Sequence, residues 1–234
     1  GTNRGVSRYD RATDDFTCYQ NDPANPDSLL EGSVHAVGAD ENGTIWVGCA
    51  KGLNRFNRET GTFTRFINDP NNPDSVSANG IRSILPDRGG IWICTYTGGL
   101  NRYDAASGKF EHFSNDRNDP RSLGANETRT VVRDRSGTLW VGTSGGGLNR
   151  FDPATRTFER ILHDPGNPRS LGGNRVWTLF EDRAGSLWVG TETNGISRSD
   201  PTGGLFQVWR NDPQRPDSLS NDNVWSILED RAGN

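Results

Sequence analysis

The chain has 234 residues and a formal net charge of −4 at pH 7. Its pI near 5.4 lacks the basic footprint of nucleic-acid binding, and no run of about 18 apolar residues occurs, so neither nucleic acid nor direct membrane insertion is expected. Only 31% of residues are hydrophobic while 29 are Gly and 12 are Pro, a balance typical of short strands joined by tight turns.

Three phrases recur along the chain and define a repeat. The first contains a tryptophan, at spacings of 46, 48 and 48 residues: Trp46, Trp92, Trp140 and Trp188. The second begins with glycine and contains an arginine (Arg8, Arg55, Arg102, Arg150 and Arg198). The third is a Pro-rich loop that begins at Asn21, Asn68, Asn115, His163 and Asn211. A period of about 40 to 50 residues rich in short strands predicts the blades of a β-propeller.

The predicted fold is all-β, a β-propeller of four-stranded antiparallel blades with about five repeats visible over 1–234. In chain order we expect a partial blade over 1–20, blades over about 33–67, 80–114, 127–162 and 175–210, and the first strand of a further blade over 223–229. Two arrangements remain open. The chain is an excerpt of a longer array, which we favour, or a five-blade ring closed by its two ends.

One repeat shows how the strands are expected to follow each other. Strands are predicted over 175–181, 186–191, 196–199 and 205–209, with turns at 182–185, 193–195 and 201–204. The first turn reads Asp-x-x-Gly, which suits a type I turn followed by a left-handed glycine. The same pattern recurs at 40–43, 87–90, 134–137 and 230–233.

The residues that every copy carries are expected to build every copy. The repeated tryptophans are predicted to wedge between neighbouring blades, with ligand stacking as the alternative. The repeated arginines are predicted to pair bidentately with the hairpin aspartates. The three cysteines are substitutions within the repeat, so we predict no metal site and no cofactor. Calcium bound by the Pro-rich loops is a weaker alternative, because those loops lack a dense run of carboxylates.

Ligand contacts are expected where the copies differ, because each blade meets a different part of a ligand. Large variable side chains stand one position into the first strand of each blade: His35, Arg82, Arg129, Trp177 and Trp225. The second-to-third turns vary as well: Arg4, Lys51, Tyr96, Ser144 and Glu192. Both sets are predicted on one face near a central channel. Arg suits a carboxylate or sulfate and Trp a sugar face; the alternative is that these residues only line a wet pore.

The phrases resemble the two-component regulator propeller repeat over essentially the whole chain. The resemblance rests on DRSGTLWVGTSGGGLNRFD from Asp134, DRAGSLWVGTETNGISRSD from Asp182, and the Pro-rich loops. It implies a seven-bladed propeller that serves as the periplasmic or extracellular sensor of a hybrid histidine kinase. It also implies a carbohydrate or acidic oligosaccharide ligand, and allows a dimer formed through the parent protein.

Two other functions remain open beside a non-catalytic sensor. A propeller lyase or glycosidase would draw on His35 and Tyr96 as bases, or on Glu127 and Glu192 as paired carboxylates. No motif supports either set, so we predict no catalytic residues and no enzyme. The third possibility is a scaffold whose rim binds another protein.

Overall fold

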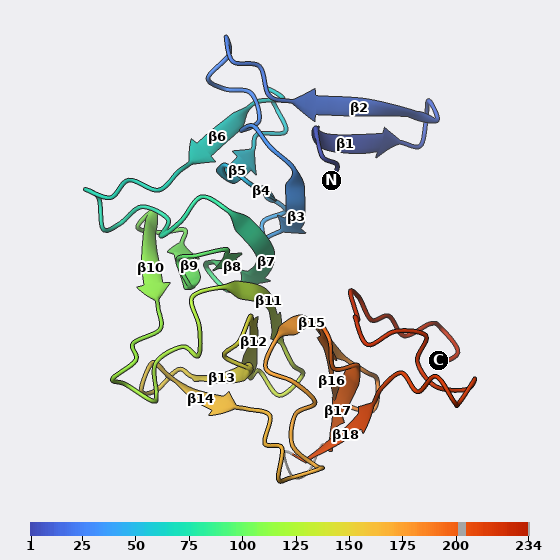
Figure 1. The fold of residues 1–234 in the computed structure, drawn as a ribbon. Helices are drawn as coiled ribbons and strands as arrows, with labels where there is room; N and C mark the ends of the chain where they lie inside the picture. Colours follow the sequence, from blue (N-terminus) through green and yellow to red (C-terminus); the bar gives the residue numbers. More distant parts are fainter. Residues whose placement is uncertain (201–204, 234) are drawn as a thin grey trace. The chain divides into compact units, whose positions relative to one another are not determined.

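The structure is a computed structural model that describes residues 1–200 and 205–233. It contains 18 strands within those residues (Figure 1). The chain divides into two compact units, Gly1–Phe113 and Ser114–Asn234. Each unit is described by itself. The turn expected at 201–204 lies outside the described residues.

The first unit holds a two-stranded sheet and two four-stranded blades. The two-stranded sheet pairs β1 (Gly5–Asp10) with β2 (Asp15–Gln20). The first blade contains β3 (Val34–Ala39), β4 (Ile45–Cys49), β5 (Gly52–Phe56) and β6 (Phe63–Phe66). The second contains β7 (Ile81–Asp87), β8 (Gly90–Thr95), β9 (Leu100–Asp104) and β10 (Lys109–Phe113).

The second unit holds two further blades of the same kind. One contains β11 (Thr128–Arg133), β12 (Leu139–Thr143), β13 (Leu148–Asp152) and β14 (Thr157–Ile161). The other contains β15 (Val176–Glu181), β16 (Leu187–Thr191), β17 (Ile196–Ser199) and β18 (Phe206–Trp209). Consecutive strands pair antiparallel in every blade, so each blade is a simple meander. The predicted four-stranded antiparallel blades are confirmed.

The strand expected over 223–229 does not form. The segment runs without ladder pairing, although the Val224 N–H donates to the Thr191 carbonyl at 3.0 Å. A strand requires a neighbour that satisfies its backbone groups in turn, and the described residues supply no second strand there. Residues 223–229 therefore have the sequence pattern of a first strand but no strand pairing.

Apolar side chains fill the space between neighbouring blades within each unit. In the first unit Trp46 is 2% exposed, and its ring lies 5.0 Å from that of Tyr103 in the next blade. In the second unit Trp140 packs on a core that includes Val176, Leu179 and Leu187 of the next blade. The first strands of adjacent blades also lie side by side, β3 with β7 and β11 with β15.

Glycines in the second strands permit this close approach. A Cβ on Gly142 would lie 2.5 Å from Val176 Cγ1 of the next blade. A Cβ on Gly48 would lie 2.4 Å from Ile81 Cγ2 in the same way. Non-bonded carbon atoms do not approach each other this closely, so a larger residue would force the blades apart.

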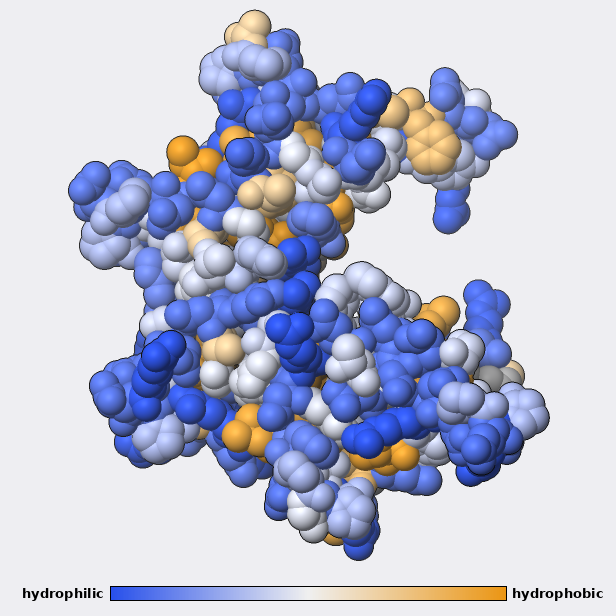
Figure 2. All heavy atoms as spheres, viewed as in Figure 1, coloured by the Kyte–Doolittle hydropathy of each residue, from blue (hydrophilic) through white to orange (hydrophobic). Residues whose placement is uncertain are grey.

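The visible surface is mostly hydrophilic, with apolar atoms in small separate areas (Figure 2). This agrees with the composition, because the few large apolar residues are buried between the blades and the surface is left to polar residues. Within the part of the chain that the structure describes, no helix is long and apolar enough to cross a membrane.

Candidate functional site

The hairpin aspartates are structural and bind the repeated tryptophans. Oδ2 of Asp40 accepts the indole N–H of Trp46 at 3.0 Å, while Oδ1 accepts the backbone N–H of Thr44 at 2.9 Å. The same pair recurs as Asp134 with Trp140, at 2.7 Å. Burial by itself would raise the pKa of Asp40, but the hydrogen bonds from Trp46, Thr44 and Asn42 outweigh it and hold that pKa below its ordinary value of 3.8.

The sequence predicted that the repeated arginines pair with the hairpin aspartates, but in the structure Arg198 and Arg102 lie against tryptophan rings. The Arg198 guanidinium lies 5.5 Å from the ring centroid of Trp188 instead. Arg102 lies 5.7 Å from the ring of Trp92, and its Nε is 3.9 Å from Asp87 Oδ2. A stack on an electron-rich ring therefore takes the place of a bidentate salt bridge.

One hairpin differs from its sequence pattern. Asp87 pairs directly with Gly90, so the turn between β7 and β8 contains only Arg88 and Gly89. The positive φ of 71° falls on Gly89, whereas Gly43 and Gly137 carry it in other blades. The expected Asp-x-x-Gly turn at 87–90 is wrong by one residue, because this copy is one residue shorter between Asp and Trp.

The Pro-rich loops satisfy their own polar groups. Asp22 Oδ1 accepts the Ala24 N–H at 2.9 Å, and Ser28 Oγ accepts the Asp22 N–H at 2.8 Å. Asn54 is fully buried, and its Oδ1 accepts the N–H of Leu30 at the end of the loop before its blade. These oxygens serve backbone N–H groups as in Asx turns, so the loops hold their shape through the chain's own hydrogen bonds.

The variable residues of the first strands share one feature that the sequence does not reveal. Each is the extra residue of a β-bulge: the register passes over one residue of the first strand while the second strand advances by one step. The four positions are His35, Arg82, Arg129 and Trp177. A bulged residue stands outside the ladder and its side chain is re-aimed. The fold thus places one first-strand residue outside the ladder in each of the four blades.

In the first unit the bulge places a cation on an aromatic ring. The Arg82 guanidinium carbon lies 4.6 Å from the ring centroid of Tyr96, which stands in the turn between β8 and β9. Desolvation, and then the charge of Arg82, lower the pKa of His35 from 6.5. His35, Arg82 and Tyr96 therefore form one cluster. Lys51 occupies the exposed turn between β4 and β5.

In the second unit the bulge residues Arg129 and Trp177 form one series of contacts with Trp225. The Arg129 guanidinium lies 4.5 Å from the ring of Trp177, whose centroid lies 4.1 Å from that of Trp225. Trp225 is 65% exposed. The indole Nε1 of Trp177 is buried and meets no acceptor among the described residues.

Carboxylates offset the arginines of the second unit. Glu127 forms an ion pair with Arg129, and Glu192 accepts from Arg175 Nη1 at 2.5 Å. By contrast, Arg82 makes no hydrogen bond or ion pair with any residue that the structure describes. Glu127 and Glu192, the two glycosidase candidates, are thus each paired with an arginine. The guanidinium N–H groups of Arg82 have no acceptor among the described residues.

The blades and their repeated contacts can be compared with known proteins. Residues 122–145 and 170–193 match the family described as "Two component regulator propeller". These two segments are similar to the two-component regulator propeller repeat. The matched segments include the Asp–Trp hairpins of both blades in the second unit. A search of the curated proteins found no match to the sequence.

Solved structures show the propeller fold. The chain is similar to the extracellular domain of the hybrid two component system BT3049 from B. thetaiotaomicron, with 22% identity, a TM-score of 0.73 and coverage of 100% of this chain and 36% of that one. The extracellular domain of BT4673 from the same organism gives 24% identity, a TM-score of 0.75 and coverage of 100% and 28%. Virginiamycin B lyase from Staphylococcus aureus is 15% identical, with a TM-score of 0.62, and the match covers 90% of this chain and 64% of the lyase. The chain spans about a third of the length of the two B. thetaiotaomicron domains.

Proposed function

We propose that the chain is the ligand-binding part of a periplasmic or extracellular sensor in a two-component signalling protein, and that it carries out no chemistry itself. The repeats and the similarity to extracellular domains of such systems support this role. A dimer formed through the parent protein is consistent with it. We propose that the residues at the β-bulges contact the ligand, because the bulges direct their side chains away from the strand pairing.

The ligand class that the geometry supports best is an oligosaccharide with acidic groups. The observation that carries this choice is Arg82, whose guanidinium lies on Tyr96 with its donors uncommitted. A guanidinium binds a carboxylate or sulfate through two parallel hydrogen bonds. In the second unit Trp225 is 65% exposed and, with Trp177 beside it, offers apolar ring surface that suits the apolar face of a sugar.

The test for the first unit compares two arginines on the same strand pair. Arg82→Ala removes the uncommitted guanidinium, and Arg88→Ala removes another arginine from the turn that follows β7. Binding of oligosaccharides with uronic acid or sulfate groups, and of neutral ones, is measured by titration calorimetry. We expect Arg82→Ala to weaken acidic ligands at least about tenfold, equal to about 1.4 kcal/mol, and Arg88→Ala to leave them unchanged. Equal binding by both variants would remove Arg82 from the site.

The second unit is tested through Trp225, which can be removed at little structural cost because it is exposed. Trp225→Ala should weaken both acidic and neutral oligosaccharides by a similar factor, since the ring contacts the sugar and not its charge. Unchanged binding would contradict the aromatic part of the proposal. The salt dependence of binding separates the two units further, because screening reduces only the contribution of the charge.

A propeller lyase is the second candidate, favoured by the fold similarity to virginiamycin B lyase and by the lowered pKa of His35. A neutral imidazole can accept a proton near pH 7. Incubation with acidic polysaccharides distinguishes the two functions. The sensor binds the polymer and leaves its length unchanged, while a lyase shortens it.

A further inference from the structure

Glu127 forms an ion pair with Arg129, the bulged arginine of the second unit. We propose that Glu127 is a specificity-determining residue that excludes carboxylate and sulfate groups from Arg129, so that the second unit selects neutral sugar residues. This inference rests on the proposed function above and adds a rule of selection to it.

The position of Glu127 in the repeat allows its side chain to vary. Its backbone carbonyl accepts the N–H of Ser144, in the turn between β12 and β13, at 2.8 Å. In the first unit the Gly80 carbonyl accepts the N–H of Tyr96 at the same distance, and Gly80 also stands two residues before a bulged arginine. Because only the backbone is used, the side chain at this position can change while the hydrogen bond is kept.

The guanidinium of Arg129 lies between Trp177 and Glu127. Its carbon is 4.5 Å from the ring centroid of Trp177, and its Nη2 donates to Oε1 of Glu127. The Arg129 side chain is 14% exposed and the Glu127 side chain 29% exposed. A ligand that approaches Arg129 therefore meets the carboxylate of Glu127 as well. That charge repels a second carboxylate or a sulfate, whereas it does not repel a neutral hydroxyl group.

A second carboxylate extends the same arrangement in this unit. Oε2 of Glu192 accepts from Nη1 of Arg175 at 2.5 Å. Arg175 stands two residues before the bulged Trp177, at the position that Glu127 has in its own blade, and its carbonyl accepts the Glu192 N–H at 3.0 Å. The two ion pairs sum to zero formal charge, so neither arginine presents an uncompensated charge to an acidic ligand.

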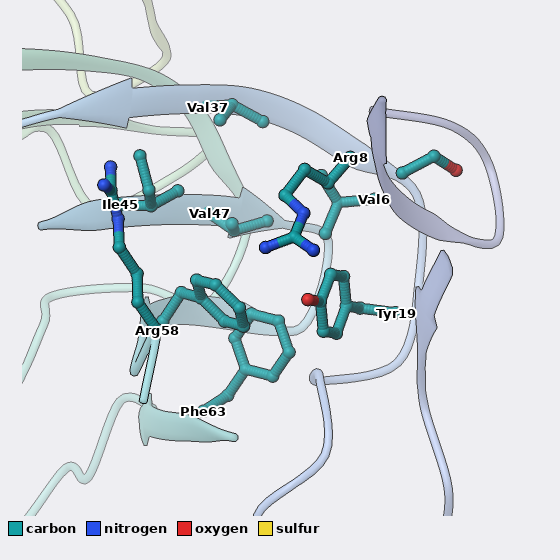
Figure 3. Close-up of a pocket in the computed structure, with 10 residues that line it drawn as sticks. Val6, Arg8, Tyr19, Val37, Ile45, Val47, Arg58 and Phe63 are labelled. Carbon is teal, nitrogen blue, oxygen red and sulfur yellow. The ribbon is translucent and has the colours of Figure 1, made fainter. Parts of the chain in front are cut away.

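The bulged arginine of the first unit has a different neighbour. Arg82 makes no hydrogen bond or ion pair with any residue that the structure describes, and Gly80 stands at the place of Glu127. Arg8 and Arg58 also line a cavity of about 370 Å³ whose lining residues include no Asp or Glu (Figure 3). A carboxylate beside an arginine is therefore not a general feature of this chain, which supports a specific role for Glu127.

The test uses two sugar tetramers that differ only in charge, tetragalacturonate and its methyl ester. Calorimetry measures their binding to the whole 234-residue chain in an Arg82→Ala background, so that the arginine of the first unit does not mask the second unit. Glu127→Gln removes the charge and keeps the size of the side chain. We expect tetragalacturonate to bind at least about fivefold more tightly, and the methyl ester to bind with unchanged affinity.

Glu159→Gln is the matched control. Oε2 of Glu159 lies 2.5 Å from Nη2 of Arg150 on the outer strand pair β13–β14, so this variant breaks an ion pair of the same kind in the same blade. It changes the net charge by the same amount as Glu127→Gln. We expect it to leave the binding of both tetramers unchanged.

Glu127→Ser is a second variant, which removes the acceptor together with the charge. Serine stands at the same repeat position at Ser33, whose carbonyl accepts the Ala50 N–H at 3.1 Å, so the fold accommodates it. Circular dichroism verifies that all variants are folded.

Three results would overturn the inference. They are unchanged binding of tetragalacturonate by both Glu127 variants, an equal gain for the methyl ester, or an equal gain in Glu159→Gln. The proposed function is judged separately, because it fails when Arg82→Ala alone leaves the binding of tetragalacturonate unchanged.

Discussion

The indole Nε1 of Trp140 donates a 2.7 Å hydrogen bond to Oδ2 of Asp134, the residue that opens the same hairpin. The turn and the wedge between blades are therefore one unit: the carboxylate that shapes the turn also fixes the ring that fills the interblade space. The bond recurs at Asp40, Asp87 and Asp182 with the tryptophans of their own hairpins.

This relationship predicts a loss of stability in acid. The pKa values of Asp40, Asp134 and Asp182 lie below the ordinary 3.8, because hydrogen bonds outweigh the burial that would raise them. A lowered folded-state pKa adds stability above the ordinary value, and that stability is lost as the pH falls through the folded-state pKa. The melting temperature should therefore drop as the pH is lowered below about 4. A variant with all three residues changed to Asn should show a shallower drop; an equal slope would contradict the prediction.

The two roles of Trp46 can be separated by substitution. Trp46→Phe keeps most of the apolar contact but leaves Asp40 without the indole donor, which we expect to destabilise the fold by about 1.5–3 kcal/mol. Trp46→Ala also removes the ring from its contacts with Phe66 and Tyr103, and should cost about 3–5 kcal/mol. Urea unfolding measures both. A Phe variant as unstable as the Ala variant would show that the hydrogen bond dominates.

Asn149 should be replaceable by serine but not by leucine. Its Oδ1 accepts the Gly124 N–H at 2.8 Å, and its Nδ2 donates to the Val141 carbonyl at 3.3 Å. Asn149→Leu leaves these buried groups unsatisfied, at about 1–3 kcal/mol for each group. Serine occupies this position at Ser197, whose Oγ accepts the Gly172 N–H at 3.0 Å. Thermal unfolding should therefore rank Asn149→Ser well above Asn149→Leu, and equal melting temperatures would refute the bridging role.

Gly142→Ala should destabilise the second unit by about 1–3 kcal/mol through overpacking. The new Cβ would lie 2.5 Å from Val176 Cγ1 and 2.7 Å from Thr130 Cγ2. The double variant with Val176→Ala provides the control, since a smaller partner relieves the first contact. Unfolding free energies from a double-mutant cycle should be non-additive, with a coupling of at least about 0.5 kcal/mol. Strict additivity would mean that the blades do not meet at this pair.

The repeat of phrases was enough to predict the four blades, because the period, the turn residues and the strand pattern all indicate short antiparallel strands. The exception at 223–229 is instructive. Val224 and Trp225 match the first-strand pattern, but a strand is a property of a pair, and the described residues provide no partner for it. The shifted turn at Gly89 was readable from the sequence, because Trp92 follows Asp87 by five residues, whereas Trp140 follows Asp134 by six.

The candidate site was only partly predictable. Variation between copies pointed to Arg82 and Trp177, but not to the β-bulges that hold them, because a bulge appears only when two strands are placed in register. The sequence also did not indicate that Glu127 forms an ion pair with Arg129 and neutralises its charge.

The bulges have a consequence for how such a chain could be altered. The four positions hold a histidine (His35), two arginines (Arg82 and Arg129) and a tryptophan (Trp177), yet each occupies the same unpaired step of its strand. Since no ladder bond depends on the identity of that side chain, these positions can be randomised together in a combinatorial library while the scaffold is kept constant. The architecture thereby lets these four side chains vary independently of the strands that carry them.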